Sequence, residues 1–500
     1  MGIIQKESIK LTVVFYLGSA LGFLNRIIFF ANFLTATQVG LVGVLTNVGM
    51  LYAQIATIGI PGISNRFFPF FNNKKKRHHG FFFWSNLFVF GGFLLSTLIF
   101  IALKPLIIRQ YIDNSPLFVN YYYSLIPLAL AFVYFQFFEG YLRSLLKTVV
   151  PTFLNEVFSK LLQTACIVLY AMKWVNFHQF IIIYIFCNFL ITFILLCYIV
   201  YLGEFFIRPE KSRMYKRLIG PILTYGFFII LLVIGSSILV SVDGLMIASK
   251  LDLAQAGIYN TIFLLSTALS LPYYSIQKIT FPLIGRLWKD RDMISVTGLY
   301  HKTTLDMMII GGGFMLLLLG NIDFIFGFIP KEYSMAKYSL YFLALGRYTE
   351  MACGLNGIIV LTSKKYKYDV IFLALLVVMT IILNLVLIPT YGITGAAIAV
   401  MFSLSFYSFL RVGLVWYFFK MQPFTLNCFW ILLITIGTFI VVHFIPLFYN
   451  KYISMCINSA VIGVLYMGLI LFFRFSPEIN NMAFKITGWK YLKTDKSIFD

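Results

Sequence analysis

Ionisable side chains interrupt several of the long apolar runs in this chain of 500 residues. Those that lie deepest in such runs are Arg26, Glu156, Lys160, Asp243, Arg347 and Glu350. A charged side chain in hydrocarbon is costly and usually faces a cavity, a partner or a transported ion. Arginine and lysine can bind an anionic group, and a carboxylate can exchange a proton or hold a cation. These residues are therefore the first candidates for a binding or ion-coupling site.

Two pairs among these residues can also neutralise themselves. Glu156 and Lys160 are one helical turn apart, and Arg347 and Glu350 are nearly so. Side chains at this spacing share one helix face, so each pair is either a structural ion pair or a contact for cargo or an ion. The sequence leaves both interpretations open.

Charges near the ends of apolar runs have a simpler interpretation. Arg66, Arg143 and Arg411 lie where a long side chain can reach the lipid head groups. Glu139 precedes Arg143 by one turn and is predicted to pair with it. Asp306 lies at the mouth of an apolar run and is a weaker site candidate.

The composition requires a membrane to hold these residues. The chain is 60% hydrophobic and only 11% charged, whereas about a quarter of the residues of a soluble domain are charged. Apolar runs near 20 residues predict an all-α polytopic membrane protein of about fourteen transmembrane helices. The predicted spans are 11–30, 40–63, 81–103, 117–141, 150–172, 179–202, 218–240, 256–277, 304–328, 338–361, 368–388, 394–418, 428–448 and 454–473.

The distribution of basic residues supports this layout. The net charge is +21, and most lysines and arginines fall on the side of the two termini, including the run Lys74–Arg77. The opposite side carries Lys104, Arg109, Lys173, Lys250, Lys331, Lys337 and Lys451. The positive-inside rule therefore predicts cytoplasmic termini in a cell inner (plasma) membrane. The run 74–79 is interpreted as a loop that faces lipid head groups, and no nucleic-acid partner is expected.

A repeat relates two halves of the chain. Leu17-Gly18-Ser19, Arg26, Leu34, Gln38 and Gly40 recur, at a constant offset of 217 positions, as Ile234-Gly235-Ser236, Asp243, Leu251, Gln255 and Gly257. The one charged position of the repeat holds Arg26 in the first copy and Asp243 in the second. Both halves begin on the same side, which indicates two parallel lobes related by a pseudo-twofold axis along the membrane normal.

This frame gives the predicted domain organisation. It comprises an N-terminal lobe (1–207), a cytoplasmic linker (208–217), a C-terminal lobe (218–420), two additional helices (421–475) and a cytoplasmic tail (476–500). Each lobe contains six helices. The tail is interpreted as a segment at the membrane surface.

Two motifs resemble a known transporter superfamily. The segment Asn384 to Ala397, with Pro389, Gly392 and Gly395-Ala396-Ala397, resembles the helix-turn-helix signature of polysaccharide flippases of the multidrug/oligosaccharidyl-lipid/polysaccharide superfamily. Val242-Asp243, Gly257-Ile-Tyr259 and Phe281-Pro282 resemble the start of the second lobe in those proteins and in lipid II flippases. Pro389 is predicted to end one helix, and Gly392 to permit a tight reversal into the next.

The resemblance implies a central cavity, alternating access and a Wzx-type cargo. That cargo is an undecaprenyl-diphosphate-linked glycan, such as an O-antigen, capsule or exopolysaccharide repeat unit, moved from the inner to the outer leaflet. Asn25 and Asn260 fall on helices that by resemblance line the cavity. Substrate contact is assigned to Arg26, Asp243, Arg347, Lys160, Asn25 and Asn260, and ion coupling to Glu156, Glu350 and Asp243. Other polysaccharide-assembly proteins are further expected partners.

The equivalent residues Arg26 and Asp243 support a more specific hypothesis. The guanidinium of Arg26 offers a planar pair of donors that suits a diphosphate, and Asp243 can hold Arg26 while no cargo is bound. The alternative is a static salt bridge between the lobes. The sequence is compatible with both interpretations.

Rival functions are a cation-coupled exporter of small molecules and a membrane glycosyltransferase or polymerase. The second rests on Asp290-Arg-Asp292, a DxD that can hold a metal but is more typical here of a solvated loop. No ATP-binding P-loop is present, so protons or Na⁺ are candidate coupling ions. The cysteines lie in or beside apolar runs without a CxxC pair and are expected to be buried free thiols. No enzyme activity, metal or cofactor is expected.

Overall fold

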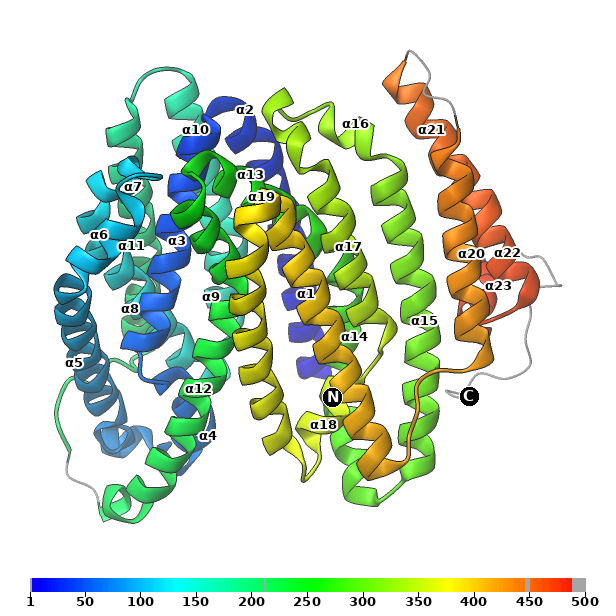
Figure 1. Cartoon of the computed structure of the whole chain (residues 1–500). Helices are drawn as coiled ribbons and strands as arrows, with labels where there is room; N and C mark the ends of the chain where they lie inside the picture. The colour runs from blue at the N-terminus through cyan, green and yellow to red at the C-terminus, as the bar shows by residue number, and fades with distance from the viewer. Residues whose placement is uncertain (1, 211–212, 446–449, 488–500) are drawn as a thin grey trace. The chain divides into compact units, whose positions relative to one another are not determined.

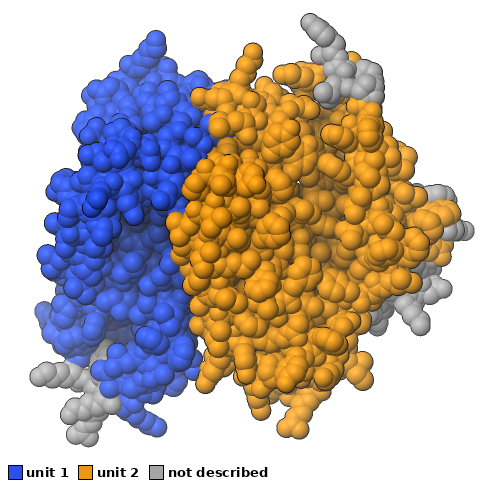
Figure 2. All heavy atoms as spheres, in the orientation of Figure 1, with its two compact units in different colours: residues 1–261 blue, residues 262–500 orange. Residues whose placement is uncertain are grey.

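The computed structural model describes residues 2–210, 213–445 and 450–487. Every regular element within these ranges is helical, as the composition predicted. The chain divides into two compact units, residues 1–261 and residues 262–500, which Figure 2 colours separately. The side chains of residues 211–216 in the predicted linker, and of most of the predicted tail, lie outside the described part of the chain.

The first unit contains the helices labelled α1 to α13 (Figure 1). They are α1 (Gly2–Phe23), α2 (Ala31–Phe33), α3 (Ala36–Ala56), α4 (Ile60–Phe71), α5 (Phe81–Ala102), α6 (Lys104–Tyr111), α7 (Pro116–Asn120), α8 (Leu125–Ser144), α9 (Val149–Phe153), α10 (Ser159–Ala171), α11 (Phe177–Tyr201), α12 (Arg213–Lys250) and α13 (Leu253–Thr267). Two π-helical segments join some of these helices into longer rods, η1 (Leu24–Phe30) after α1 and η4 (Leu154–Phe158) before α10.

The second unit continues with the end of α13 and the helices labelled α14 to α23. They are α14 (Leu271–Asp290), α15 (Met293–Gly320), α16 (Ile322–Phe326), α17 (Lys337–Ala352), α18 (Asn356–Thr362), α19 (Tyr366–Phe419), α20 (Leu426–His443), α21 (Lys451–Val461), α22 (Gly468–Phe473) and α23 (Pro477–Thr487). Its core is built from buried apolar side chains of α14, α15, α18 and α19 on one side and of α15, α20 and α22 on the other.

Helical residues occupy all fourteen predicted ranges, but fewer helices meet the requirements for a membrane span. Ten helices in the described part of the chain are long and apolar enough to cross a membrane. One of these, the 54-residue α19, reverses direction and covers two predicted spans. The range 150–172 is helical but is divided among α9, η4 and α10 and carries Glu156 and Lys160. The count of fourteen therefore stays a prediction.

The reversal inside α19 occurs at Gly392. This residue has φ 59° and ψ −139°, a conformation that favours glycine. A β-carbon on Gly395 would lie 2.0 Å from the carbonyl oxygen of Leu387, so the returning arm starts in direct backbone contact with the outgoing one. Pro389 does not end the first arm, because the helix continues through it to Tyr391. The glycine, rather than the proline, makes the turn.

The repeat has a structural explanation in the helix caps. Thr35 caps α3, accepting from the backbone N–H of Gln38 at 3.3 Å, while Gln38 accepts from the N–H of Thr35 at 3.0 Å. At the same offset of 217 positions, Asp252 accepts from the backbone N–H of Gln255 at 2.7 Å and precedes α13. Such caps satisfy N–H groups that the first helical turn leaves without partners. The repeated glutamine therefore marks the beginning of equivalent helices.

The two equivalent helices also contact each other through equivalent positions. A β-carbon on Gly40 would lie 1.7 Å from the carbonyl oxygen of Leu253, and one on Gly257 would lie 2.4 Å from that of Ala36. Gly40 corresponds to Gly257 in the repeat, and Ala36 corresponds to Leu253. Gly40 contacts Leu253, and their counterparts in the other copy, Gly257 and Ala36, contact each other in the same way. Such reciprocal contacts are the signature of a twofold relation. The segments 36–43 and 253–260 thus cross at a local pseudo-twofold axis.

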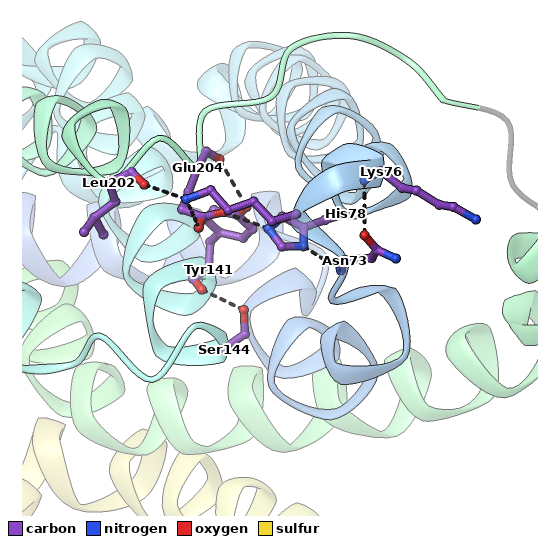
Figure 3. A network of polar contacts seen from close by, with 8 residues as sticks. Asn73, Lys76, His78, Tyr141, Ser144, Leu202 and Glu204 are labelled. Carbon is purple, nitrogen blue, oxygen red and sulfur yellow. Dashed lines mark hydrogen bonds and ion pairs between the residues drawn. The ribbon is translucent and has the colours of Figure 1, made fainter. Parts of the chain in front are cut away.

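The basic run Lys74–Arg77 belongs to a folded turn whose lysines are exposed, and its contact with lipid head groups stays a prediction. Arg77, His78 and His79 all have positive φ, from 46° to 53°, and a residue with a side chain pays roughly 1–2 kcal/mol for that conformation. Contacts to the end of α11 compensate for this cost. The Glu204 carboxylate lies 3.0 Å from Nζ of Lys74 and 2.7 Å from Nε2 of the buried His78 (Figure 3).

The hydrogen bonds of His78 define its tautomer. Its Nδ1 accepts from the backbone N–H of Asn73 at 3.1 Å, so the ring proton is on Nε2 and is donated to Glu204 (Figure 3). Tyr141 on α8 donates its hydroxyl to the carbonyl oxygen of Glu204 at 3.2 Å. The turn, α8 and the residues that follow α11 are therefore joined at one end of the first unit.

The C-terminal helix α23 belongs to the tail that was predicted to lie at the membrane surface. The beginning of this tail is attached to α15. Ser476 donates its hydroxyl to the carboxylate of Asp306 at 2.6 Å, and Glu478 forms an ion pair with Lys302. Ser476 is only 1% exposed. The weak candidate Asp306 therefore anchors the beginning of the tail.

Candidate functional site

The predicted site residues of the first unit lie on two interrupted helices. Asn25 and Arg26 belong to the π-helical segment η1, and Glu156 belongs to η4. A π-helical turn adds one residue to each hydrogen-bonded ring, is rare, and is often found at functional sites. Each turn changes the direction in which the following side chains point. The π-helical turns therefore lie at two of the charged candidate positions, Arg26 and Glu156.

Asn25 joins these two helices. Its Nδ2 donates to the carbonyl oxygen of Lys160 at 2.7 Å, and its Oδ1 accepts from the hydroxyl of Thr164 at 2.7 Å. The side chain is 2% exposed, so an apolar residue here would leave a buried carbonyl oxygen without this partner. The structure therefore gives Asn25 a bracing role between η1 and α10.

Glu156 and Lys160 do not form the ion pair that their spacing allowed. No ion pair joins them among the described residues, and Glu156 instead accepts from Nδ2 of Asn155 at 3.2 Å. The π-helical turn between them removes the ordinary one-turn alignment. Lys160 still interacts electrostatically with Glu156 and with Arg26. Two cations and one carboxylate thus share this part of the unit.

Arg26 reaches the crossing of α3 and α13. A β-carbon on Gly43 would lie 3.0 Å from Nη2 of Arg26 and 2.8 Å from Nδ2 of Asn260. Gly43 and Asn260 are equivalent positions of the repeat, at the same offset as Arg26 and Asp243. The absence of a side chain at Gly43 therefore makes room for two hydrogen-bond donors side by side.

Asp243 lies at the same crossing. It is 1% exposed and accepts a hydrogen bond from the hydroxyl of Tyr259 at 3.3 Å. A β-carbon on the adjacent Gly244 would lie 2.6 Å from Oδ1 of Asn260. The amide of Asn260 is therefore enclosed between Gly43 and Gly244. Its Nδ2 is buried and donates to no acceptor within the described part of the chain.

The second unit holds the other pair of candidate residues. Nη1 of Arg347 lies 3.3 Å from Oε2 of Glu350, so the ion pair that their spacing allowed is present. The guanidinium also lies over the ring of Phe263, with Cζ 5.3 Å from the ring centroid. Their side chains are 10% and 21% exposed. The predicted pair of Glu139 and Arg143 is likewise confirmed, at 2.6 Å.

Arg411 corrects one prediction and reveals a residue that the sequence analysis missed. Instead of reaching the head groups, it donates from Nε and Nη2 to the carboxylate of Asp369, at 2.7 and 2.9 Å. Its guanidinium also packs against Tyr407, 4.0 Å from the ring centroid. Both charges belong to α19, on opposite sides of the reversal at Gly392. The sequence feature that indicates this ion pair is Asp369, a single aspartate near the start of an apolar run.

The Asp290-Arg-Asp292 motif is a helix junction. Asp290 is the last residue of α14, and Arg291 has φ 58°. The Asp292 carboxylate caps α15 by accepting from the backbone N–H of Ser295 at 3.0 Å. Hydrogen bonds from Ser295 hold the pKa of Asp292 below its usual range. The described residues also contain no cluster of three His, Cys, Asp or Glu side chains that could hold a metal.

Buried thiols are present where the apolar runs predicted them, with two exceptions. Cys166, Cys187, Cys353 and Cys428 are buried, whereas Cys197 and Cys456 are exposed on the described surface. Sγ of Cys166 lies 3.5 Å from Sγ of Cys187.

A comparison with known families identifies the protein class. The model of a family described as polysaccharide biosynthesis protein matches residues 4–288, which is more than half of the chain. The chain belongs to this family. The matched range includes the polar crossing of α3 and α13.

Other relatives of this polysaccharide biosynthesis family member are more distant. An uncharacterised membrane protein of Methanocaldococcus jannaschii is 25% identical over 281 residues, which cover 55% of this chain and 54% of that protein. The match thus spans about half the length of the curated relative.

Solved structures show the fold. The lipid II flippase MurJ in an inward closed conformation superposes with a TM-score of 0.72 at 15% identity, covering 93% of this chain and 99% of that one. An inward-facing multidrug resistance MATE transporter of the MOP superfamily gives a TM-score of 0.58 at 14% identity, covering 80% and 92%. This member of the polysaccharide biosynthesis family is therefore a multi-pass membrane protein with the fold of these two transport proteins.

Proposed function

We propose that the protein is a flippase that moves a polyprenyl-diphosphate-linked oligosaccharide from the cytoplasmic to the outer leaflet by alternating access. The observation that carries the proposal is the pair of donors over Gly43, the guanidinium of Arg26 and the Nδ2 of Asn260. A diphosphate presents several anionic oxygens, and charge-assisted hydrogen bonds from a guanidinium fork suit them. Membership of a polysaccharide biosynthesis family supports a glycan as part of the cargo.

The surroundings of this pair favour an anionic ligand. Lys160 adds a second cation, and the Nδ2 of Asn260 lacks an acceptor among the described residues. A buried donor without an acceptor carries a free-energy cost that a ligand oxygen can remove. Asp243 supplies a carboxylate at the same crossing and is proposed to hold Arg26 until cargo or an ion enters.

The cellular setting follows the sequence topology. We place the protein in the inner (plasma) membrane with cytoplasmic termini, where it receives lipid-linked glycan from other polysaccharide-assembly proteins. The N-terminal lobe, linker and C-terminal lobe predicted from the repeat supply the moving parts. Proton or Na⁺ coupling is assigned to membrane carboxylates, with Glu156 and Glu350 as the first candidates.

The test of the cargo contact is Arg26→Lys in proteoliposomes loaded with a fluorescent undecaprenyl-diphosphate-linked sugar. Lysine keeps the charge and loses the fork, so translocation should fall about tenfold or more, because a charged hydrogen bond contributes roughly 1.5–3 kcal/mol. The exposed Arg109 of α6 provides the matched control, and Arg109→Lys should leave the rate unchanged. Equal rates for the two variants would reject cargo contact by Arg26.

A double variant separates cargo binding from a static salt bridge. If Arg26 and Asp243 matter only to each other, Arg26→Ala with Asp243→Ala should recover activity relative to either single change. The proposal expects no recovery, because the cargo partner is still missing. Transport of small drug cations that does not require a lipid-linked sugar would instead indicate an exporter of small molecules.

The coupling proposal has its own experiment. Glu156→Gln with Glu350→Gln removes both candidate exchangeable protons while leaving the side-chain size almost unchanged. Transport driven by an imposed pH or Na⁺ gradient should then lose its dependence on that gradient. A double variant that still follows the gradient would exclude these two carboxylates.

A further inference from the structure

A polar cleft in the second unit lies apart from the residues assigned to cargo. It lies where α15, α16, α17, α20 and α21 end or begin, and it comprises two adjoining cavities of about 460 and 580 Å³. The two cavities share Asp323, Ser334, Lys337 and Asn458 in their walls. Each cavity alone is in the size range of sites that hold small ligands.

Cations converge on this cleft. Lys331, Lys337 and Lys451 line it, and Asp323 is the acidic residue among its described lining residues. Asp323 forms an ion pair with Lys337, which leaves the charges of Lys331 and Lys451 uncompensated within the lining. Lys451 turns inward over α16, because its Nζ would lie only 3.1 Å from a β-carbon placed on Gly327.

The location of these lysines is unusual for the chain. The sequence topology assigns them to the face opposite the termini, which carries few basic residues. Topology signals do not require lysines on that face. A cluster there is better explained by attraction of an anion, since converging like charges in a concave site raise the local concentration of counter-ions.

The floor of the cleft is also polar. Asn458 donates from Nδ2 to the carbonyl oxygen of Gly320 at 2.8 Å. Asn321, which is 8% exposed, donates from Nδ2 to the carbonyl oxygen of Leu317 and to the hydroxyl of Ser459. Its Oδ1 accepts no hydrogen bond from the residues that the structure describes. A buried acceptor of this kind requires a donor, such as a hydroxyl group at the floor.

The opposite wall is aromatic. Tyr341 and Phe439 contact each other edge to face with ring centroids 6.2 Å apart, and Phe439 stacks on His443 at 6.1 Å. Tyr338 adds a largely exposed ring to the same wall. Aromatic rings present flat apolar surfaces with polar tips, which suit ligands that are partly apolar and partly wet.

We infer that this cleft is a binding site for a phosphate ester that carries hydroxyl groups. Lys331 and Lys451 bind the phosphate, the floor amides face the hydroxyl groups, and the aromatic wall covers the carbon skeleton. Two sources share this chemistry, the head group of a glycerophospholipid and a phosphorylated sugar of a transported glycan. The site does not depend on the diphosphate contact proposed for Arg26.

The test uses the full-length protein, purified in detergent and stripped of lipid. Native mass spectrometry measures retention of phosphatidylglycerol against phosphatidylcholine with the same acyl chains, and glucose 1-phosphate is the soluble probe. Lys331→Gln with Lys451→Gln removes the two uncompensated cations without touching the ion pair of Asp323. Lys173→Gln with Lys250→Gln is the control, because it removes the same charge from exposed lysines assigned to the same face.

The wild type and the control should retain phosphatidylglycerol or bind glucose 1-phosphate, and the cleft variant should lose that affinity by about tenfold. Loss of the lipid alone assigns the head group as the source, and loss of the sugar phosphate alone assigns the glycan. The inference is overturned if the two double variants behave alike. It is also overturned if the wild type neither prefers phosphatidylglycerol nor binds glucose 1-phosphate.

Discussion

Adding one methyl group at Gly40 should weaken the first unit more than the same change elsewhere in that unit. The β-carbon of Gly40→Ala would lie 1.7 Å from the carbonyl oxygen of Leu253, whereas real β-carbons hardly ever approach within 3.0 Å. The helices α3 and α13 must therefore separate locally by at least about 1.3 Å. Both clashing groups are close to or part of the backbone, so no side chain can rotate to absorb the change.

The expected magnitude follows from two opposing terms. Overpacking costs typically 1–3 kcal/mol, and a contact with backbone belongs at the upper end of that range. Alanine gains roughly 1 kcal/mol over glycine in a helix interior. The net loss should be about 2 kcal/mol, which corresponds to roughly 4–8 °C in the unfolding temperature for a unit of this size.

The assay is thermal unfolding of the purified protein in detergent at one fixed heating rate. Gly91→Ala on α5 is the control, because a β-carbon there meets nothing within 4 Å. Gly257→Ala, with its closest approach of 2.4 Å to the carbonyl oxygen of Ala36, should fall between the two. Unfolding of Gly40→Ala at the same temperature as Gly91→Ala would refute a close crossing of α3 and α13.

Two further predictions concern topology and the buried ion pair of α19. Cysteines placed at Lys75 and Asp113, which are both exposed, should react with a membrane-impermeant reagent from the cytoplasmic and outer sides respectively, and reaction of both from one side would break the assigned layout. Asp369→Leu alone should lower the free energy of unfolding by about 3–5 kcal/mol, because it strands the charge of Arg411, and adding Arg411→Leu should restore part of that loss in a denaturation series. A double variant less stable than the single one would show that the pair was not the cause.

Apolar runs and charge position were sufficient to predict a helical membrane protein and most of its segments. The repeat was also accessible, because caps and close glycine contacts constrain residue type strongly enough to leave the same letters at Gln38 and Gln255 or at Gly40 and Gly257. The same offset relates Gly43 to Asn260, but the sequence does not mark their contact, because the two residues differ.

Other parts of the site had no comparable signal. The π-helical turns at Arg26 and Glu156 depend on packing between helices, and an inserted residue in a helix leaves no characteristic sequence. The pairing of Asp369 with Arg411 depends on the exact angle at which the two arms of α19 return past each other. The spacing of Glu156 and Lys160 allows an ion pair only in an ordinary α-helix, and the π-helical turn removes that alignment.

The contact between the equivalent segments 36–43 and 253–260 shows how such a chain can recognise an asymmetric molecule. In a homodimer, the positions of Gly43 and Asn260 would hold the same residue. Two glycines would leave the axis without a polar group, and two asparagines would collide, because even one β-carbon at Gly43 would lie 2.8 Å from the amide nitrogen of Asn260. Joining both halves in one chain lets each copy change alone. A single amide can then stand beside the axis, so an approximately symmetric scaffold can present different groups to the two ends of its cargo.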